Sequence, residues 1–196
     1  MSFYTFARAV CRGYFAIFHR WQVIGKEHVP MDGPVLLLAN HVSLLDPPSV
    51  GSGTDRQVTI MAKEELFKVP VLGPMIRALG AFPIKRGAGD RAALRLALGL
   101  LEDGKCLLMF PEGTRSKTGE MEEGQTGAAF FALRSQAVII PAAVVGGYRL
   151  FRRTKIVYGK PLDISEFRNA KSSKQTLADL TEHIMSAIEE LIREHR

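Results

Sequence analysis

Short apolar runs alternate with longer helical stretches along most of this sequence, and this alternation limits the possible folds more than any other feature. The runs that we expect to form strands are Val35–Ala39, Val58–Met61, Phe82–Lys85, Cys106–Phe110, Val138–Val145 and Lys155–Tyr158. The stretches that we expect to form helices are Asp46–Gly51, Leu72–Leu79, Ala88–Glu102 and Gly127–Ser135. Strands that alternate with helices predict an α/β fold, in which helices flank a mostly parallel or mixed central sheet.

The C-terminal segment has helical periodicity. Its apolar residues recur at steps of three and four, at Leu177, Leu180, Ile184, Ile188 and Leu191. Ser172 and Gln175 precede this run at the spacing of a capping box. The chain has 196 residues, enough for one domain with a sizeable core, and no repeat or low-complexity tract divides it. We therefore expect one layered domain over residues 23–196.

The first 22 residues predict a separate amphipathic helix. At about 100° per residue, one arc of roughly 120° contains the apolar side chains, which are Phe3, Phe6, Ala7, Val10, Tyr14, Ile17, Phe18 and Trp21. On or toward the opposite side lie Arg8, Arg12, His19 and Arg20. Such a helix can lie in a membrane interface, or it can pack its apolar face on the domain. The absence of any acidic residue before Glu27 favours the membrane.

The overall charge is basic, because 26 Lys and Arg residues outnumber 20 Asp and Glu residues and leave a net charge of +6. This excess suits an anionic partner: nucleic acid, an acidic membrane face or a phosphorylated substrate. Two distant cysteines predict neither a disulfide framework nor a zinc site, so we expect a reducing compartment. The unbroken apolar runs, such as residues 35–39, are far shorter than the ~20 residues of a transmembrane helix, and no signal peptide is evident. We expect a cytoplasmic protein that reaches any membrane from that side.

The first polar loop, residues 40–46, follows the expected strand over 35–39. One turn of the chain can bring the carboxylate of Asp46 to His41, where it would hold the imidazole in one tautomer and stabilise the protonated form. Imidazole is the usual general base at neutral pH, because its unperturbed pKa is about 6.5. In the structural alternative, Asp46 caps a helix that starts at Pro47, and His41 is an ordinary loop residue. Neither residue has a further ligand at metal-binding spacing, so we expect no metal site.

A second polar segment, residues 110–117, follows the expected strand over 106–110. Gly113 permits close backbone approach, Thr114 offers a hydroxyl, and Arg115 offers a planar guanidinium that suits phosphate. A structural turn can have this composition, but turns seldom combine Glu, Arg and Lys directly after a buried strand.

Two more strand ends carry cations. Lys85 and Arg86 end the segment over 83–87, and Lys63 follows the expected strand over 58–61. Any one such charge is usually a solvated surface residue. The carboxyl ends of parallel strands meet at one edge of a sheet. Four cations in matching positions at such an edge therefore predict a phosphate site; they are Lys63, Lys85, Arg86 and Arg115.

No side chain has the pattern of a covalent nucleophile. Cys11 belongs to the N-terminal helix, and Cys106 opens a buried strand, where a thiol is usually inert. Ser43 is close to His41 in sequence but lacks the Gly-x-Ser-x-Gly pattern. We therefore expect His41 to activate a group of the substrate itself.

Four blocks together resemble the glycerolipid acyltransferases, and specifically the bacterial lysophosphatidic acid acyltransferases. The blocks are Asn40-His41-(four residues)-Asp46, Pro83-Ile84-Lys85-Arg86, Phe110-Pro111-Glu112-Gly113-Thr114-Arg115-Ser116 and Val138-Ile139-Ile140-Pro141-Ala142. They occur in the order that the family has and cover roughly residues 35–145. Each block is weak alone, and the four together are specific.

The resemblance implies a role for each motif residue. His41 would be the general base that deprotonates an acceptor hydroxyl, which then attacks an acyl thioester directly, and Asp46 would orient it. The residues implied to bind the substrate are Lys63, Arg86, Glu112, Gly113, Thr114 and Arg115. Within this set the cations would hold the glycerol phosphate. The donor would be acyl-CoA or acyl-carrier protein, and no cofactor or metal is implied.

The implied reaction transfers an acyl chain to the sn-2 hydroxyl of lysophosphatidic acid and gives phosphatidic acid for phospholipid biosynthesis. The protein would be peripheral or monotopic on an anionic surface, the cytoplasmic face of the cell membrane. One alternative is another lysolipid or a glycerol-phosphate-like acceptor, and another is a basic membrane- or nucleic-acid-binding domain without catalysis. Aromatic residues gather in the N-terminal helix rather than beside Arg86 and Arg115, which argues against nucleic acid.

Overall fold

The centre of the molecule is a sheet whose middle strands are apolar on both faces. In the computed structural model, which describes residues 3–84 and 91–196, the strands are β1 (Gln22–Ile24), β2 (Val35–Ala39), β3 (Val58–Lys63), β4 (Phe82–Ile84), β5 (Cys106–Met109), β6 (Val138–Val145) and β7 (Lys155–Tyr158). Within those residues the strand order is β1-β7-β6-β2-β5-β3-β4, and only the β6–β7 pair is antiparallel. The predicted α/β fold with a mostly parallel, mixed sheet is therefore confirmed.

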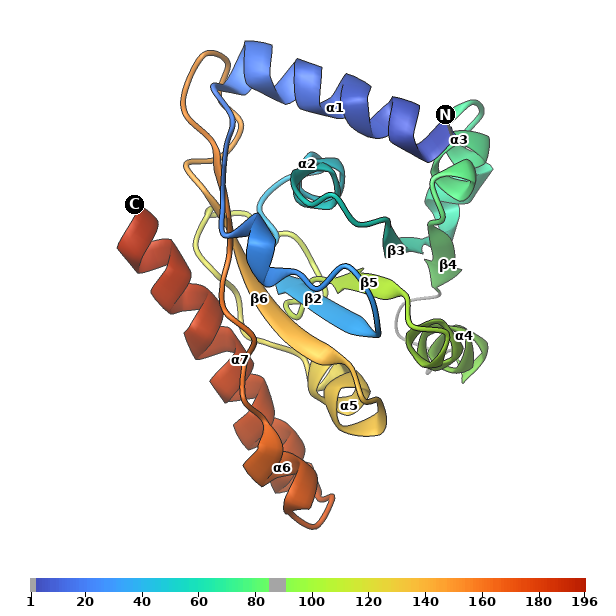
Figure 1. Ribbon diagram of the computed structural model, residues 1–196, viewed down its shortest axis with the longest axis vertical. Coiled ribbons are helices and arrows are strands. Elements are labelled where there is room, and N and C mark those ends of the chain that lie inside the picture. Colours follow the sequence, from blue (N-terminus) through green and yellow to red (C-terminus); the bar gives the residue numbers. More distant parts are fainter. Residues whose placement is uncertain (1–2, 85–90) are drawn as a thin grey trace.

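Helices cover both faces of this sheet (Figure 1). They are α1 (Phe3–His19), α2 (Asp46–Gly53), α3 (Leu72–Ala78), α4 (Arg91–Glu102), α5 (Gly127–Arg134), α6 (Ser165–Asn169) and α7 (Lys174–His195), with short 3₁₀ helices η1 (Lys26–His28) and η2 (Glu64–Lys68). Leu36 and Leu38 of β2 share one core cluster with residues of α4, α5 and α7, whereas Val35 and Leu37 share another with α2. A strand buried on both faces has no solvent side, so it is apolar throughout instead of alternating.

Two elements differ from the sequence-based expectation. β1 was not expected, because three residues are too short for a recognisable pattern, and it becomes a strand only by parallel pairing with β7. The predicted capping box of Ser172 and Gln175 is wrong. Ser173 caps α7, and its side chain accepts a hydrogen bond from the backbone N–H of Thr176. The expected strand residue Lys85 and the start of the expected helix over 88–102 lie outside the described residues.

Helix α1 lies across α2 with its basic side toward the domain (Figure 1). The Arg12 guanidinium donates to the carbonyls of Ser52 and Thr54 at the C-terminal end of α2, at 2.8 and 3.0 Å. It also pairs with the Asp55 carboxylate at 2.8 Å. On the same helix, Phe15 is fully buried. The unpaired carbonyls at a helix end attract cations, which explains why this side of α1 faces inward.

The apolar stripe of α1 points away from the domain. We use this name for the exposed residues Phe3, Phe6, Val10, Tyr14, Ile17 and Phe18. For these six residues the alternative in which this face packs on the domain is wrong. Trp21, which the prediction placed on the same face, is half-buried and packs against the core. Among the described residues, no helix is both long and apolar enough to cross a membrane.

Parallel pairing determines where the polar loops lie. β2, β5, β3 and β4 are adjacent and parallel, so all four end at the same edge of the sheet. The segments that leave this edge are residues 40–45, residues 64–71 and the β5–α5 loop, residues 110–126. Among the described residues, this edge therefore carries the His41–Asp46 segment, the Glu112–Arg115 segment and Lys63.

Candidate active site

Side-chain hydrogen bonds hold the backbone around His41. The Asn40 amide joins the end of β2 to β6, because it donates to the Val144 carbonyl (3.2 Å) and accepts from the Val144 N–H (2.7 Å). The backbone N–H of His41 donates to Glu112 Oε1 at 2.6 Å. The His41 carbonyl accepts from the N–H of Ser116 at 2.8 Å. His41 is thus held from β6 and from the β5–α5 loop.

His41 and Asp46 are in direct contact, as predicted. Asp46 is fully buried, and its Oδ2 lies 2.8 Å from His41 Nδ1. The same oxygen accepts from the backbone N–H groups of Val42 and Ser43, each at 2.6 Å. A carboxylate oxygen can only accept a hydrogen bond, so the proton of the neutral imidazole must be on Nδ1. Nε2 then has a free lone pair. The imidazole stacks on the Phe110 ring at a centroid distance of 4.1 Å.

Glu112 is engaged by backbone groups on both carboxylate oxygens. Oε1 accepts from His41, and Oε2 accepts from the N–H of Glu122 at 2.9 Å. Burial raises the pKa of Glu112, while these two N–H donors act in the opposite direction. Next to it, Gly113 has a φ of +68°, which L side chains rarely adopt, and an added Cβ would crowd Gln125. In this geometry Glu112 holds the backbone of His41 through Oε1 and the backbone of Glu122 through Oε2.

The predicted phosphate-binding residues lie on the same edge but are not gathered into one contact. Thr114 and Arg115 are exposed on the β5–α5 loop. Lys63 is exposed at the end of the neighbouring strand β3, where its Nζ is 3.2 Å from Glu65 Oε1. Arg86 lies outside the described residues.

Comparison with known proteins identifies the family. A family model described as Acyltransferase matches residues 20–145, nearly two thirds of the chain. The chain belongs to this acyltransferase family. The acyltransferase is 32% identical over 176 residues to the 1-acyl-sn-glycerol-3-phosphate acyltransferase of Bacillus subtilis, with 87% of each chain covered. It is 29% identical over 180 residues to the enzyme of that name from Streptococcus pneumoniae, with 85% of this chain and 65% of that protein covered.

A solved structure has the same fold. The crystal structure of the 1-acyl-sn-glycerophosphate (LPA) acyltransferase PlsC from Thermotoga maritima superposes with a TM-score of 0.77 and 24% identity. The match covers 97% of this chain and 79% of that one. At this level of identity, the likeness supports the fold of the acyltransferase.

Sequence reasoning missed Tyr148. Its hydroxyl and Asp46 Oδ1 are both buried, and neither has a hydrogen-bond partner among the described residues. Burial first, and then the charge of Asp46, raise the pKa of Tyr148 far above its ordinary value, so the hydroxyl stays protonated and can donate toward Asp46. The Tyr148 ring also packs on Phe15 and His19 of α1. No spacing signal connects residues so distant in sequence.

Ser49 was also missed, and it lies between α1 and the catalytic pair. Trp21 Nε1 donates to Ser49 Oγ at 3.1 Å. Ser49 also interacts with Tyr148, whose pKa it lowers. The chain that follows α1 is therefore connected through Ser49 and Tyr148 to the neighbourhood of Asp46.

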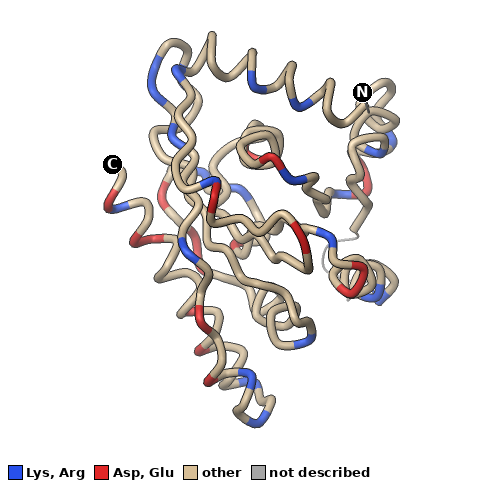
Figure 2. The backbone as a smooth tube through the Cα atoms, viewed as in Figure 1, with Lys and Arg blue, Asp and Glu red and all other residues tan. Residues whose placement is uncertain are grey.

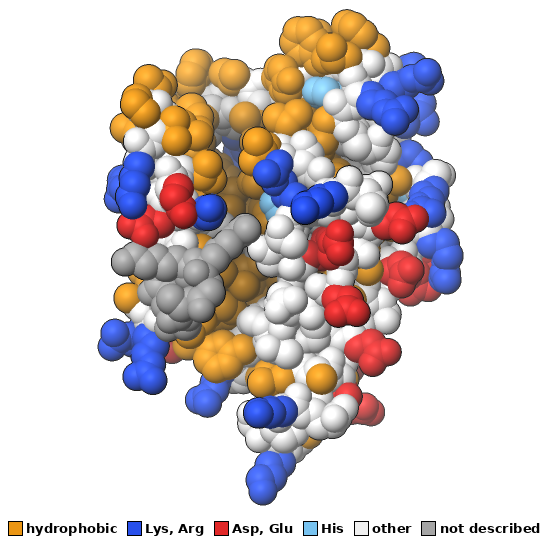
Figure 3. Space-filling model, turned by 180° about the vertical axis from the view of Figure 1, so that it is seen from behind, with side chains coloured by type: hydrophobic (Ala, Val, Ile, Leu, Met, Phe, Trp, Pro, Cys, Tyr) orange, Lys and Arg blue, Asp and Glu red, His pale blue; other side chains and the backbone are white. Residues whose placement is uncertain are grey.

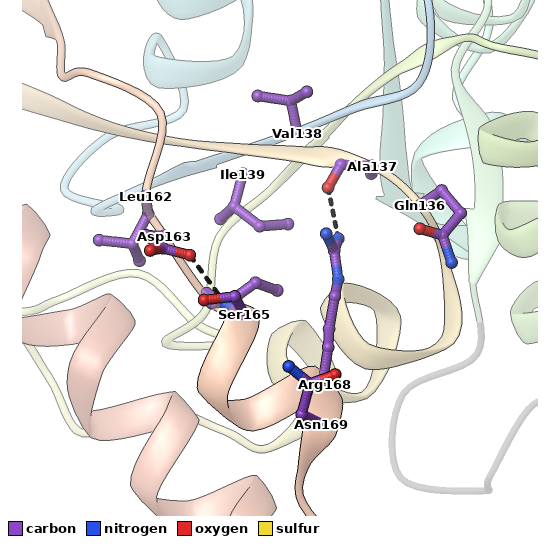
Figure 4. Close-up of a pocket in the computed structure, with 10 residues that line it drawn as sticks. Gln136, Ala137, Val138, Ile139, Leu162, Asp163, Ser165, Arg168 and Asn169 are labelled. Atoms are coloured by element: carbon purple, nitrogen blue, oxygen red, sulfur yellow. Dashed lines mark hydrogen bonds between the residues drawn. The ribbon is translucent and has the colours of Figure 1, made fainter.

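Figure 3 shows a hollow in the face opposite to that of Figure 1. Hydrophobic side chains line it, and Lys, Arg and His side chains stand near its edge. A separate cavity of about 310 Å³ lies between α6 and the start of β6, at the other edge of the sheet (Figure 4). The guanidinium of Arg168 points across it and donates to the Ala137 carbonyl at 2.7 Å. That cation is engaged in holding α6 to β6, and neither His41 nor Asp46 lines this cavity.

The cysteines of the acyltransferase are poor nucleophiles. Burial raises the pKa of Cys106 to about 12, and partial burial also raises the pKa of Cys11. In the part of the chain that the structure describes, no group of three or more His, Cys, Asp or Glu side chains could hold a metal ion. The sheet edge thus carries a buried His–Asp contact of the kind that can serve general-base chemistry.

Proposed function

We propose that this acyltransferase moves a fatty acyl chain from acyl-CoA or acyl-carrier protein to the sn-2 hydroxyl of 1-acyl-sn-glycerol 3-phosphate. The product is phosphatidic acid for phospholipid biosynthesis. The observation that carries the proposal is the contact of His41 with buried Asp46 at 2.8 Å, in a family where similar chains have this enzyme's name. The proposal divides the chain into a membrane-interface helix over residues 1–22 and an acyltransferase domain over residues 23–196.

In the proposed mechanism, His41 acts as general base. Its Nε2 takes the proton from the acceptor hydroxyl as the oxygen attacks the thioester carbonyl and forms a tetrahedral intermediate. The intermediate then expels the thiolate, which receives that proton from His41. Asp46 holds the tautomer and stabilises the imidazolium while it carries the proton. Both substrates are bound together, because the described residues offer no activated nucleophile for an acyl-enzyme.

The cations at the sheet edge are proposed to bind the acceptor phosphate. Arg115 is exposed on the loop that follows β5, the strand next to β2, and Lys63 is exposed at the end of β3, on the other side of β5. Family resemblance adds Arg86. Gly113 and Thr114 lie in the same loop and would contact the acceptor. Guanidinium groups bind phosphate through paired hydrogen bonds. The hydrophobic hollow in Figure 3 would hold the acyl chains.

The apolar stripe of α1 is proposed to lie in the anionic cytoplasmic face of the cell membrane. Four of its side chains, Phe3, Phe6, Val10 and Ile17, are more than half exposed. Burial in the membrane interface would contribute about 25 cal/mol per Å² of apolar surface. The enzyme would thus meet its lipid acceptor in the plane where that lipid resides.

A panel of acceptors tests the proposed reaction. Purified protein receives a palmitoyl donor and either lysophosphatidic acid, glycerol 3-phosphate or lysolipids with other headgroups. We expect turnover with lysophosphatidic acid to exceed turnover with acceptors that lack a terminal phosphate monoester. Equal rates with all lysolipids would contradict the proposed phosphate recognition, and absence of thioester turnover would contradict catalysis.

His41→Ala should lower acyl transfer by about 10²–10⁴-fold, the usual contribution of a general base. His183→Ala is the matched control, because His183 is exposed on α7 and packs on Phe167, away from the sheet edge. Circular dichroism should show that both variants remain folded. Near-normal turnover by folded His41→Ala protein would rule out the proposed mechanism.

A further inference from the structure

A second cavity, of about 510 Å³, lies where the end of α1, the β6–β7 connection and the end of α7 meet. Four arginines, one lysine and one histidine are among the residues that line it, and no Asp or Glu is. It contains none of the residues of the catalytic pair or of the β5–α5 loop. Val145, at the end of β6, belongs to its wall, so the cavity lies at the same edge of the sheet as His41. Its volume is typical of a small-molecule site, for which roughly 300–1,000 Å³ is usual.

The cations of this cavity are available to an anion. Arg20, Arg152 and Arg153 are exposed, and no carboxylate in the described part of the chain forms an ion pair with them. Figure 2 shows Lys and Arg gathered on the β6–β7 connection beside the C-terminal end of α1. By contrast, Lys155 is engaged, because its Nζ donates to the His195 carbonyl at 2.6 Å. Uncompensated guanidinium groups around one cavity favour a phosphate ligand.

The backbone holds these arginines in a defined arrangement. Arg20 and Phe151 have φ angles of 42° and 60°, in the left-handed region that L residues rarely adopt. The β6–β7 connection is bound to the end of α1, because Phe151 N–H donates to the Phe18 carbonyl and Thr154 N–H to the His19 carbonyl. Backbone in such conformations often occurs at ligand sites, where the surrounding structure maintains it. The cavity is therefore formed before any ligand arrives.

Exposed apolar side chains stand beside the cations. Leu150 and Phe151 are 63% and 64% exposed, and the Phe151 ring lies 6.4 Å from that of Phe18. Phe18 belongs to the apolar stripe of α1, so the stripe continues onto the β6–β7 connection. A ligand that fits both features has a phosphate next to hydrocarbon, which is the chemistry of a phospholipid in a membrane.

We propose that this cavity binds the phosphate headgroup of an anionic phospholipid, in the same membrane on which the apolar stripe lies. The site is separate from the acceptor site, and it would set the orientation of the sheet edge on anionic membranes. The inferred orientation of the protein rests on the membrane location that the proposed function gives to the apolar stripe. Binding of the headgroup, by contrast, does not require that the protein transfers acyl chains. The donor acyl-CoA also contains phosphate and hydrocarbon, but its pantetheine arm separates the phosphates from the acyl chain, whereas here the exposed leucine and phenylalanine stand directly beside the arginines.

Vesicle binding tests the proposal. The full-length protein is sedimented with vesicles of phosphatidylcholine alone or with 20 mol% phosphatidylglycerol, at fixed ionic strength. Arg152→Gln/Arg153→Gln is compared with Lys171→Gln/Lys174→Gln, which removes the same charge from exposed positions near α6, at the far end of the molecule (Figure 1). We expect the anionic lipid to increase wild-type binding, and the arginine variant to lose about tenfold or more of that increase. An equal loss in both variants would overturn the proposal, because the effect would then be general electrostatic attraction.

A soluble probe tests headgroup binding without a membrane surface. Phe151 lines the cavity, so Phe151→Trp in a Trp21→Phe background places the only tryptophan of the chain in the cavity wall, where its fluorescence can report occupancy. We expect a saturable change with short-chain phosphatidylglycerol below its critical micelle concentration, and none with short-chain phosphatidylcholine. The change should disappear in Arg152→Gln/Arg153→Gln. A response of equal size to both lipids, or no response to either, would overturn the proposal.

Two controls separate this proposal from the proposed function. The arginine variant should keep acyl transfer within about twofold of wild type on detergent-dispersed substrates, because it contacts no catalytic residue. Binding of coenzyme A, measured without lipid, should also be unchanged. If coenzyme A binding falls while vesicle binding stays constant, the cavity is a donor site and the proposal is wrong. If the protein transfers no acyl group at all, the vesicle and fluorescence results still decide headgroup binding.

Discussion

At the scale of single residues, the two oxygens of Asp46 have different environments. Oδ2 accepts three hydrogen bonds, from His41 Nδ1 and from the N–H groups of Val42 and Ser43. Oδ1 is buried without a hydrogen-bond partner among the described residues, and the Tyr148 hydroxyl, also without one, lies close enough for the charge of Asp46 to raise its pKa. A buried carboxylate is destabilised unless hydrogen-bond donors surround it. Donors to Asp46 therefore hold this carboxylate in place, and the carboxylate in turn fixes the direction of the imidazole. We therefore infer that Tyr148 is a positioning residue.

Tyr148→Phe should lower kcat by about 2- to 12-fold, the equivalent of one net hydrogen bond of about 0.5–1.5 kcal/mol, and should leave KM for both substrates nearly unchanged. Tyr14→Phe is the control, because Tyr14 lies on the exposed stripe of α1. Steady-state kinetics of both variants make the comparison. A raised KM with normal kcat would assign Tyr148 to substrate binding instead.

The Cys106 thiol gives a second prediction at this scale. With its pKa raised to about 12, the group is protonated at pH 8, and only about one part in 10⁴ would be thiolate. Native protein at pH 8 should therefore react with a thiol reagent at Cys106 only as fast as it unfolds. Mass spectrometry of tryptic peptides measures this, with unfolded protein in guanidinium chloride as the reactive reference. Fast labelling of Cys106 in the native state would mean that β5 is accessible.

At the scale of elements, α1 shows that an amphipathic helix can attach by its polar side. Arg12 and Lys26 both pair with Asp55, and these two partners lower the pKa of its carboxyl. When folding lowers the pKa of a carboxyl, the charged group stabilises the fold at pH values above its pKa in the unfolded state. This stabilisation is lost as the pH falls through the pKa of the folded state. The outward stripe is left free for the membrane.

Asp55→Asn should therefore cost about 0.2–1 kcal/mol in the free energy of unfolding at pH 7, the usual range for exposed ion pairs. The cost should vanish near pH 2, where the wild-type carboxyl is also protonated. Urea unfolding at both pH values measures the difference, with Asp32→Asn, at an exposed position in the loop before β2, as reference. A cost that is the same at both pH values would exclude the charge of Asp55 as its cause.

The two sides of α1 should respond oppositely to substitution. Phe6→Ser/Ile17→Ser changes exposed residues, so the free energy of unfolding should move by less than about 0.5 kcal/mol while vesicle binding falls. Phe15→Ala removes a side chain that is 1% exposed and should cost about 3–5 kcal/mol. Vesicle sedimentation and urea unfolding distinguish the two effects. Unchanged vesicle binding by the double variant would contradict the proposed membrane role of the stripe.

At the scale of the whole molecule, parallel strands gather the proposed machinery at one edge of the sheet. The catalytic pair follows β2, the Glu112 loop follows β5 and Lys63 ends β3. An edge that holds the proposed base and the proposed phosphate-binding cations can bind donor and acceptor at the same time. Holding two reactants in position can lower a barrier by about 7–11 kcal/mol, so direct transfer needs no covalent stage.

Direct transfer predicts that radiolabelled acyl donor alone leaves no stoichiometric label on acid-quenched protein. Initial rates at several concentrations of both substrates should give intersecting rather than parallel lines. Ser43→Ala serves as the check on the hydroxyl nearest the pair, since Ser43 N–H already donates to Asp46. Label that is present in wild type and lost in Ser43→Ala would replace direct transfer by an acyl-enzyme.

Local features of the fold and site could be read from the sequence. The run Val35–Ala39 is apolar at every position, and only a strand covered on both faces suits such a run. His41 and Asp46 are five residues apart, so one turn of the chain brings them together. The motif order matched the family that the comparisons identified. In these cases either the interacting residues are close together in the sequence, or the apolar pattern alone indicates that the segment is buried.

Contacts between distant segments were decided only by the tertiary structure. Glu112 holds the backbone of His41 across 71 residues, and Tyr148, which follows the end of β6, lies close enough for the charge of Asp46 to raise its pKa. The helical periodicity of α1 predicted its apolar stripe but not the side that faces inward. That choice depended on what α2 offers to α1, and α2 presents backbone carbonyls to Arg12. A periodic pattern specifies two faces of a helix, whereas the partner surface determines which face is the more stable one to bury.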